Sequence, residues 1–211
     1  MRKISAVLLC VAALTAGCAS GPATTLDLTW VAPQLPPAPK KLLIITVAGD
    51  EGGQIAFQNQ MATELKARGV NAVASHRYFT RYTDAEKARF MKSIEESEAD
   101  YVLLARVTTT SDKALENRGT FIGSDGMPYA NEGTIEGAAA RYFNPSSYVG
   151  GADGTEKTVT AEASVFAATG EKKLIWSART RTTNAQSRLG SVIAPQYVAV
   201  ILDAMKKDKL F

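Results

Sequence analysis

The sequence has few of the residues that build metal and redox chemistry. It contains two cysteines and one histidine, His76, among 211 residues. Because zinc and other transition metals are held by clusters of cysteine and histidine, this count argues against a transition-metal centre. No EF-hand spacing occurs among the acidic residues, which leaves an all-carboxylate calcium or magnesium site open. We therefore expect no cofactor.

Long apolar runs are also absent. Residues 4–14 form an apolar segment of 11 residues, and no run of 18 or more follows it. A helix needs roughly 20 apolar residues to span a bilayer, so no transmembrane helix is predicted. The segment follows Arg2 and Lys3 and precedes the small residues Ala16 and Gly17, which is the order of a secretory signal.

Without this signal, the chain has almost no excess of charge of either sign. Loss of Arg2 and Lys3 lowers the number of basic residues from 24 to 22, against 21 acidic residues, so the net charge becomes +1. The remaining basic residues are spread along the chain. A near-neutral chain has no overall field that would attract nucleic acid, so nucleic acid is not expected as a partner.

Signatures of catalysis are missing as well. The sequence contains neither the G-x-S-x-G elbow nor the P-loop spacing. Ser75 directly precedes His76, and adjacent residues of a strand face opposite ways, so His76 is interpreted as a surface or strand-end residue. Carboxylates between residues 84 and 100 have the spacing of a solvated helix face. We expect that the protein is not an enzyme.

What the amino terminus does contain is Cys18, directly after Leu14-Thr15-Ala16-Gly17. This arrangement resembles the lipobox of bacterial lipoproteins, with Thr15 where that family usually has leucine. The resemblance implies that residues 1–17 are a lipoprotein signal peptide, that Cys18 receives a diacylglycerol and that the new amino terminus is acylated. An ordinary secretory signal with an incidental cysteine is the alternative. Cys10 would leave with the signal, so no disulfide is expected.

The residue after the cysteine carries a second implication of this resemblance. In the lipoprotein family, aspartate at this place retains a protein at the inner membrane, and here the residue is Ala19. For a chain of Gram-negative origin, the resemblance implies a periplasm-facing protein that is lipid-anchored in the outer membrane.

Residues 18–41 are interpreted as the lipidated cysteine and a proline-rich tether. Five of the eight prolines lie in residues 19–41, which favours extended over helical structure. The alternation of Leu26, Leu28 and Trp30 leaves two interpretations open, a short edge strand and a flexible linker. A single folded domain is expected to occupy residues 42–211.

Hydrophobic periodicity predicts an α/β fold for this domain. The predicted strands are 42–47, 70–78, 101–107, 158–167 and 174–183, and the predicted helices are 54–68, one after the capping-box pair Thr83 and Glu86, and one from near Pro195. The first part is β-α-β-α-β, which is typical of helices packed on a mostly parallel sheet in two or three layers. The last two strands form an antiparallel hairpin, and the chain ends in a helix.

The hairpin is predicted to have one dry and one wetter face. Leu174, Trp176 and Ala178 are assigned to the dry face, where Trp176 is expected to be a core residue rather than a ligand platform. Lys173 shares the wetter face with Arg179 and Arg181. This basic stripe is a candidate surface for an acidic partner, peptidoglycan or lipid headgroups, and a plain solvated face is the alternative.

The whole layout resembles a group of small envelope lipoproteins. The group includes the curli-pore lipoprotein family, the lipoprotein activators of penicillin-binding proteins and the amino-terminal domain of the Tol translocation protein. Residues 165–176, VFAATGEKKLIW, carry most of the resemblance. It implies a non-catalytic adaptor or assembly factor in outer-membrane or cell-wall assembly or maintenance, which binds an envelope protein or self-associates.

Residues 111–155 are the main candidate for the binding surface. A segment of this length is uncommon inside a compact domain, and it is rich in glycine and polar residues. Disordered segments are usually poor in aromatic residues. This segment contains five: Phe121, Tyr129, Tyr142, Phe143 and Tyr148. An interaction surface and a floppy insertion are both open.

The alternative function is a small-molecule or glycan-binding module. It would use the strand-end loop 48–53, because ligands of α/β sheets gather at the carboxyl ends of strands. A plain structural turn is the competing interpretation of this loop, since Asp50 and Glu51 would repel an anion.

Overall fold

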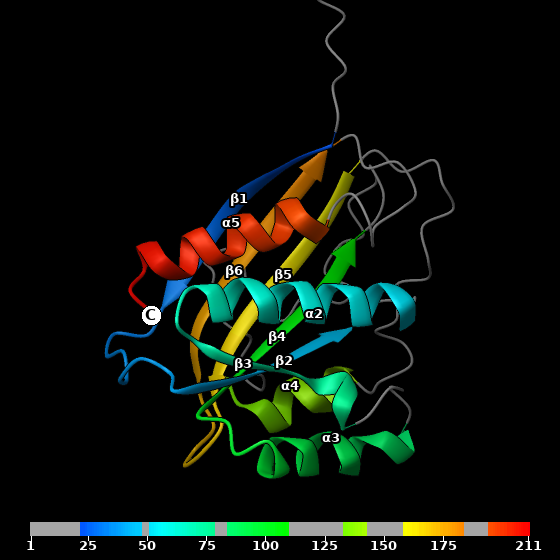
Figure 1. Ribbon diagram of the computed structural model, residues 1–211, viewed down its shortest axis with the longest axis vertical. Helices are drawn as coiled ribbons and strands as arrows, with labels where there is room; N and C mark the ends of the chain where they lie inside the picture. The colour runs from blue at the N-terminus through cyan, green and yellow to red at the C-terminus, as the bar shows by residue number, and fades with distance from the viewer. Residues whose placement is uncertain (1–21, 48–50, 79–83, 110–132, 143–157, 184–193) are drawn as a thin grey trace, which may run out of the picture.

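The computed structural model describes residues 22–47, 51–78, 84–109, 133–142, 158–183 and 194–211. These residues form a mixed α/β fold in three layers, with helices on both faces of one sheet (Figure 1). The predicted fold class is confirmed. Sequence periodicity had left two and three layers open, and the structure has three.

The sheet has six strands in the order β1-β6-β5-β4-β2-β3. Their bounds are Ala23–Val31 (β1), Lys41–Val47 (β2), Asn71–Ala74 (β3), Tyr101–Thr109 (β4), Thr158–Ala167 (β5) and Leu174–Thr183 (β6). Strand β2 pairs in parallel with β3 and β4. The other neighbours, β4 with β5, β5 with β6 and β6 with β1, are antiparallel.

Four α-helices and one 3₁₀ turn complete the described residues. They are α2 (Glu51–Ala67), η1 (Ser75–Arg77), α3 (Asp84–Glu96), α4 (Ile135–Tyr142) and α5 (Ala194–Lys207). Helices α2 and α5 lie side by side on one face of the sheet, while α3 and α4 lie on the opposite face (Figure 1). The predicted C-terminal helix is confirmed.

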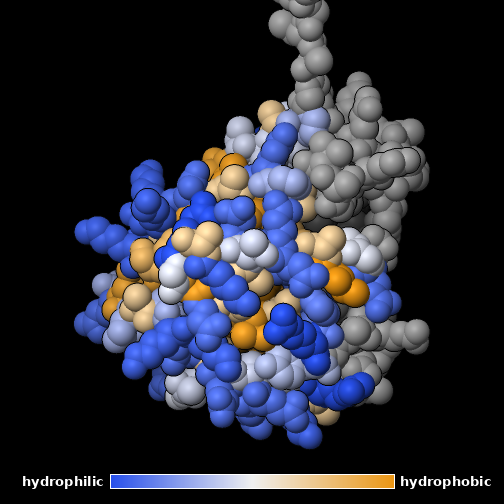
Figure 2. Space-filling model, viewed as in Figure 1, coloured by the Kyte–Doolittle hydropathy of each residue, from blue (hydrophilic) through white to orange (hydrophobic). Residues whose placement is uncertain are grey.

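The core under α2 and α5 contains apolar residues of both helices and of the sheet. Met61 and Leu65 of α2, with Ile201 and Leu202 of α5, are buried against the sheet. Helix α2 ends at Ala67, and Gly69 follows with a φ of 84°, the left-handed conformation that often terminates a helix. The surface over these two helices is mainly hydrophilic, with small apolar areas between charged side chains (Figure 2).

The core under α3 and α4 is smaller. Phe90 and Ile94 of α3 are buried, and Ile135 of α4 joins them. They pack on sheet residues that include Leu104 and Phe166. Helix α4 was not predicted, because its eight residues lie within the range interpreted as an insertion.

Strand β1 lies within the range interpreted as a tether, and it is part of the sheet. It pairs with β6 from Ala23 opposite Thr183 to Val31 opposite Trp176. Leu28 and Trp30 pack against the core under α3 and α4, so the edge-strand interpretation is the right one. The folded domain therefore begins at Ala23 rather than at Leu42. Residues 32–40, called the strap below, connect β1 to β2.

A β-bulge near the start of β6 places Leu174 on the face of the sheet opposite to the predicted one. Val165 pairs with Trp176 and Phe166 with Leu174, so Ile175 has no opposite residue. The extra residue moves Leu174 to the other face of the sheet, where it joins the core under α3 and α4. Trp176 stays under α5 and is fully buried. The assignment of Leu174 and Trp176 to one face was therefore wrong.

Trp176 is a core residue, as expected. Its exposed fraction is 0 %, and its indole N–H donates a hydrogen bond of 2.8 Å to Asp208 Oδ2. A buried indole needs such a partner, because an unsatisfied N–H in the core is costly.

Candidate interaction surfaces

One end of the sheet gathers the starts and ends of several strands. Ala23, which begins β1, lies opposite Thr183, which ends β6, and Thr183 lies opposite Thr158, which begins β5. Strand β4 ends beside them, with Thr109 opposite Thr160. We call this the Thr183 end. The β5–β6 turn, residues 168–173, marks the opposite end, called the hairpin end.

Most of the predicted aromatic surface lies outside the described residues. This holds for Phe121, Tyr129, Phe143 and Tyr148. Tyr142 is the last residue of α4. Part of the range 111–155 is thus a packed helix, because Ile135 and Ala138 of α4 are buried. The role of the five aromatic residues in partner binding stays a prediction.

The predicted basic stripe is divided by the structure, and Arg179 belongs to a buried ion pair. Its Nη2 donates to Glu162 Oε1 at 2.9 Å and its Nε donates to the same oxygen at 3.2 Å. The Glu162 side chain is 0 % exposed and that of Arg179 is 18 % exposed. Arg106 of β4 stands opposite Glu162 in the sheet register. Arg179 therefore holds the sheet together rather than offering a free cation.

The other two basic residues lie apart. Arg181 is accessible, with a side chain 57 % exposed, and its Nη2 lies 3.2 Å from Asp27 Oδ2. Asp27 occupies a bulge in β1 between Leu26 and Leu28. Lys173 lies at the hairpin end and pairs with Glu171. These three basic residues therefore form no continuous stripe.

The face predicted to be wetter is also largely buried. Ser164 of β5 and Ser177 of β6 are both 0 % exposed. They stand opposite each other in the register, and the neighbouring pair is Ala163 and Ala178. A solvated sheet face is therefore the wrong interpretation for this part of the hairpin.

Polar residues near the carboxyl ends of β2 and β3 tie these strands to α2. Gln58 Nε2 donates to Thr46 Oγ1 at 2.9 Å, and Gln58 Oε1 accepts hydrogen bonds from the Ser75 hydroxyl at 3.3 Å and the His76 amide at 2.9 Å. The His76 ring Nε2 lies 2.9 Å from Asn59 Oδ1. His76 is thus a strand-end residue, as predicted, and the group has a structural use.

The alternative ligand loop, 48–53, is only partly described. Residues 48–50 lie outside the described ranges, and residues 51–53 form the first turn of α2. The helix therefore begins three residues earlier than the predicted start at Gln54.

The strap is fastened to the sheet at its carboxyl end. Asp100 Oδ2 accepts hydrogen bonds from the amides of Lys40 at 2.9 Å and Lys41 at 2.8 Å. The Tyr101 hydroxyl donates to the Pro37 carbonyl at 2.7 Å. Burial, together with the charge of Asp100, raises the pKa of Tyr101 above its usual value, so the phenol stays protonated and able to donate.

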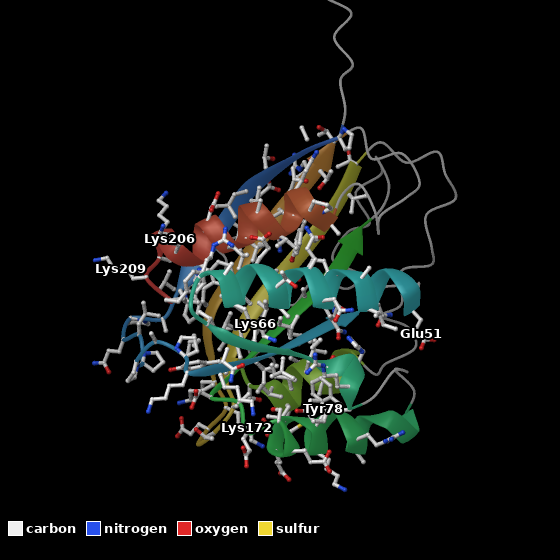
Figure 3. The ribbon with its side chains drawn as sticks, in the orientation of Figure 1. Glu51, Lys66, Tyr78, Lys172, Lys206 and Lys209 are labelled. Carbon is white, nitrogen blue, oxygen red and sulfur yellow. The ribbon has the colours of Figure 1, made fainter. Side chains whose placement is uncertain are left out.

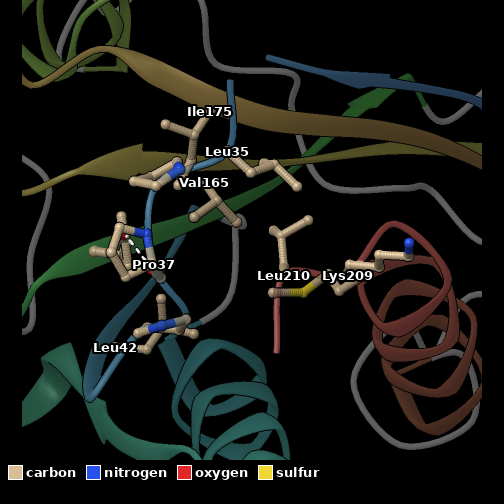
Figure 4. A pocket seen from close by; sticks show the side chains of 11 residues that line it. Leu35, Pro37, Leu42, Val165, Ile175, Lys209 and Leu210 are labelled. Carbon is tan, nitrogen blue, oxygen red and sulfur yellow. Dashed lines mark hydrogen bonds between the residues drawn. The ribbon is translucent and has the colours of Figure 1, made fainter. Parts of the chain in front are cut away.

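An apolar pocket lies between the strap and the end of α5 (Figure 4). Its lining includes Leu35, Pro37, Leu42, Val165, Ile175 and Leu210. The space inside that a water molecule can occupy is about 10 Å³. This is room for about one water, so in this conformation the pocket is too small for a typical ligand.

Metal and membrane sites can be assessed for the described ranges only. There, no group of three or more His, Cys, Asp or Glu side chains could hold a metal ion. Among the helices of these ranges, none is both long and apolar enough to cross a membrane. Cys18 lies outside the described residues.

Some structural features that the sequence analysis does not predict nevertheless leave a pattern in the sequence. The alternation in β1 was visible, and only its pairing partner was unknown. The Glu162–Arg179 pair could have been found by counting outward from the predicted hairpin turn, which places both residues at the same level. The bulge at Ile175 has no recognisable sequence pattern, because Leu174, Ile175 and Trp176 are all apolar.

Comparison with protein-family models gives no match, and comparison with curated proteins gives none either. Among solved structures, the chain is similar to a PelC dodecamer from Paraburkholderia phytofirmans that carries one substitution, with 18% identity and a TM-score of 0.42. That match covers 84% of this chain and 96% of the other. A second PelC dodecamer from the same organism matches with 16% identity, a TM-score of 0.41, and coverage of 84% and 94%. Function is therefore inferred from this chain's own residues.

Proposed function

We propose that this chain is a lipid-anchored protein of the bacterial envelope, held in the outer membrane by Cys18. It acts without catalysis, by binding an envelope protein or a second copy of itself, in the assembly or maintenance of the outer membrane or cell wall. The observation that carries this proposal is the sequence of the amino terminus. A signal that ends in small residues leads directly to Cys18, and the first strand begins five residues later, at Ala23.

Two features of the described residues support a non-catalytic role. The single histidine, His76, and the neighbouring Ser75 hydroxyl are both engaged by residues of α2. The buried Glu162 carboxylate is engaged by Arg179 inside the sheet. These polar groups hold secondary-structure elements together, which leaves them poorly placed to act as a nucleophile and its base.

Metabolic labelling with an alkyne fatty acid in a Gram-negative host tests the anchor. The unchanged chain is expected to take up the label and to fractionate with the outer membrane, while Cys18→Ser should take up none, should stay uncleaved or soluble, and should be absent from the outer membrane. Cys10→Ser is the matched control, because Cys10 is removed with the signal and its loss should change nothing. Membrane association and labelling of Cys18→Ser would contradict the proposal.

The sorting position gives a second readout of the same proposal. Ala19→Asp should move the labelled protein from the outer to the inner membrane in a density gradient, and Ala19→Ser should not. Unchanged sorting of Ala19→Asp would contradict placement in the outer membrane while leaving the lipid anchor intact.

Partner binding is tested by a photo-crosslinking amino acid in intact cells. We expect a discrete adduct, with a second copy or with one envelope protein, when the crosslinker replaces Phe121, Tyr129 or Tyr148. The control position is Thr169 at the hairpin end, which is exposed. Absence of adducts from all three aromatic positions would argue against the predicted surface.

A further inference from the structure

We infer that the Thr183 end of the sheet faces the membrane and that the hairpin end points away from it. This inference rests on the proposed lipid attachment at Cys18. It assigns the described surface around Ala23, Thr158 and Thr183 to the lipid headgroup side of the molecule.

The first step is the length of the connection. Only residues 19–22 lie between Cys18 and Ala23, where β1 begins. A fully extended chain advances at most about 3.6 Å per residue, so five steps reach about 18 Å. Had the tether extended to residue 41, as the sequence suggested, its reach would have been several times greater. A lipid on Cys18 therefore holds the Thr183 end close to the bilayer.

The second step is that β1 cannot supply extra length. It pairs with β6 over the whole range from Ala23 to Val31. Beyond it, the Ala32 amide donates to the Ile175 carbonyl at 2.9 Å, and Asp100 and Tyr101 fasten the strap. Releasing β1 would break the pairing of a full strand. The distance between the lipid and the folded domain is therefore limited by residues 19–22 and not by β1.

The third step is the chemistry of the two ends. The strand ends at the Thr183 end carry neutral side chains: Ala23, Thr24, Thr25, Thr158 and Thr183. The charged residues next to them, Arg181 and Asp27, form an ion pair. A neutral hydroxyl-rich surface can approach headgroups without stripping water from isolated charges.

The hairpin end is charged with both signs. Lys172 pairs with Glu136 at 2.9 Å, and Lys173 pairs with Glu171. Lys206 in the last turn of α5 and Lys209 just after this helix project outward, while Lys172 lies near the turn (Figure 3). These charged side chains keep their hydration when this end points into water.

If the Thr183 end faces the membrane, a partner that binds at this end must lie in or on the same membrane.

Energy transfer to the membrane surface tests the orientation. The mature lipidated chain would have no free thiol, because Cys10 is lost and the Cys18 sulfur carries the diacylglycerol, so one introduced cysteine is a unique label site. Thr183→Cys and Thr169→Cys are matched variants, since both replace exposed threonines at opposite ends of β6 and its turn. Strand β6 alone separates them by about 30 Å at roughly 3.4 Å per residue.

The lipidated full chain is reconstituted into phosphatidylethanolamine–phosphatidylglycerol vesicles that carry an acceptor dye on the headgroups, and a donor dye is attached to the new thiol. We expect transfer from position 183 to exceed transfer from position 169 by about twofold or more, given that strand-length separation. The difference should persist in about 0.5 M salt, because a covalent tether is not screened as headgroup attraction is. Equal or reversed transfer overturns the inference.

A second label site and a linker insertion complete the experiment. Thr25→Cys is a second label site near the same end, for use if Thr183→Cys fails to fold. A 20-residue Gly-Ser insertion after Ser20 should reduce the difference between the two positions, because such a linker has a mean reach of about 25 Å. A difference that survives the insertion unchanged overturns the tether as its cause. Failure of the chain to float with the vesicles counts against the lipid anchor instead, whereas floating with equal transfer counts against the orientation alone.

Discussion

The buried ion pair between Glu162 and Arg179 leads to a stability prediction. Glu162→Gln removes the negative charge with almost no change of shape. The Glu162 side chain is 0 % exposed, Arg179 donates to it at 2.9 and 3.2 Å, and Arg106 stands opposite it in the neighbouring strand. After the change, a neutral amide would stand between Arg106 and Arg179 in the register of the three strands.

The expected loss follows from the cost of leaving a buried charge without its counter-charge. Breaking such a pair typically costs 3–5 kcal/mol, and we expect about 3 kcal/mol, because the glutamine oxygen still accepts one hydrogen bond from Arg179. For a domain of this size, that corresponds to a fall in Tm of about 6–12 °C. The exposed pair offers the control. Asp27→Asn removes the partner of Arg181 at the surface, where such pairs contribute about 0–1 kcal/mol.

Urea titration of the Cys18→Ser chain, followed by circular dichroism and by the fluorescence of buried Trp176, measures both variants. The double variant Glu162→Gln, Arg179→Met should lose less stability than the sum of the two single changes, because the second change removes a charge that the first left unbalanced. If Glu162→Gln falls within about 0.5 kcal/mol of the unchanged chain, or matches Asp27→Asn, the pair does not stabilise the sheet and the reasoning is refuted.

Two other predictions concern the described residues. Tyr197 is buried and its hydroxyl has no hydrogen-bond partner in the described part of the chain, so Tyr197→Phe should stabilise the fold by about 1 kcal/mol in the same urea titration. Burial, and then the charge of Glu162, raises the Tyr197 pKa, so the unfolded chain loses this proton first. The free energy of unfolding should therefore keep its full value below about pH 10 and fall above it. Tyr197→Phe should make that fall smaller. An equal fall in both chains would contradict this cause. Asp100→Ala removes the acceptor of the Lys40 amide, at the end of the strap, and of the Lys41 amide, at the start of β2. It should cost about 1–2 kcal/mol and speed hydrogen exchange at both amides, whereas exposed Glu95→Ala should change stability by less than about 0.5 kcal/mol. Unchanged exchange in Asp100→Ala would show that the strap is held by other contacts.

Local patterns predicted most of the elements. The apolar runs at 42–47 and 101–107 became the central strands β2 and β4, and the helices predicted at 54–68 and from near Pro195 correspond to α2 and α5. Such elements are predictable because burial of one face repeats along the sequence with the period of the backbone. Boundaries were less certain, and the second predicted strand, 70–78, is only Asn71–Ala74 followed by the η1 turn.

The candidate site was less predictable than the fold. Arg179 and Arg181 have similar sequence surroundings, yet one is paired inside the sheet and the other is accessible at its surface. Their difference comes from neighbours on β5 and β1. No property of the hairpin strand alone distinguishes them, because accessibility depends on what the rest of the chain places above each side chain.

Read without the structure, the sequence predicts most of the strands and helices in their order, no apolar run long enough for a transmembrane helix, and a signal that leads to Cys18. These features depend on residues that are adjacent or a few positions apart. Tertiary structure decided that β1 closes one edge of the sheet, that Ile175 forms a bulge, and that only residues 19–22 separate Cys18 from the fold. The reason is that the residues which meet in these features are far apart along the chain. Thr24 and Thr182 share a hydrogen bond of 2.8 Å although 158 positions separate them, and such pairings leave no periodic trace in either segment.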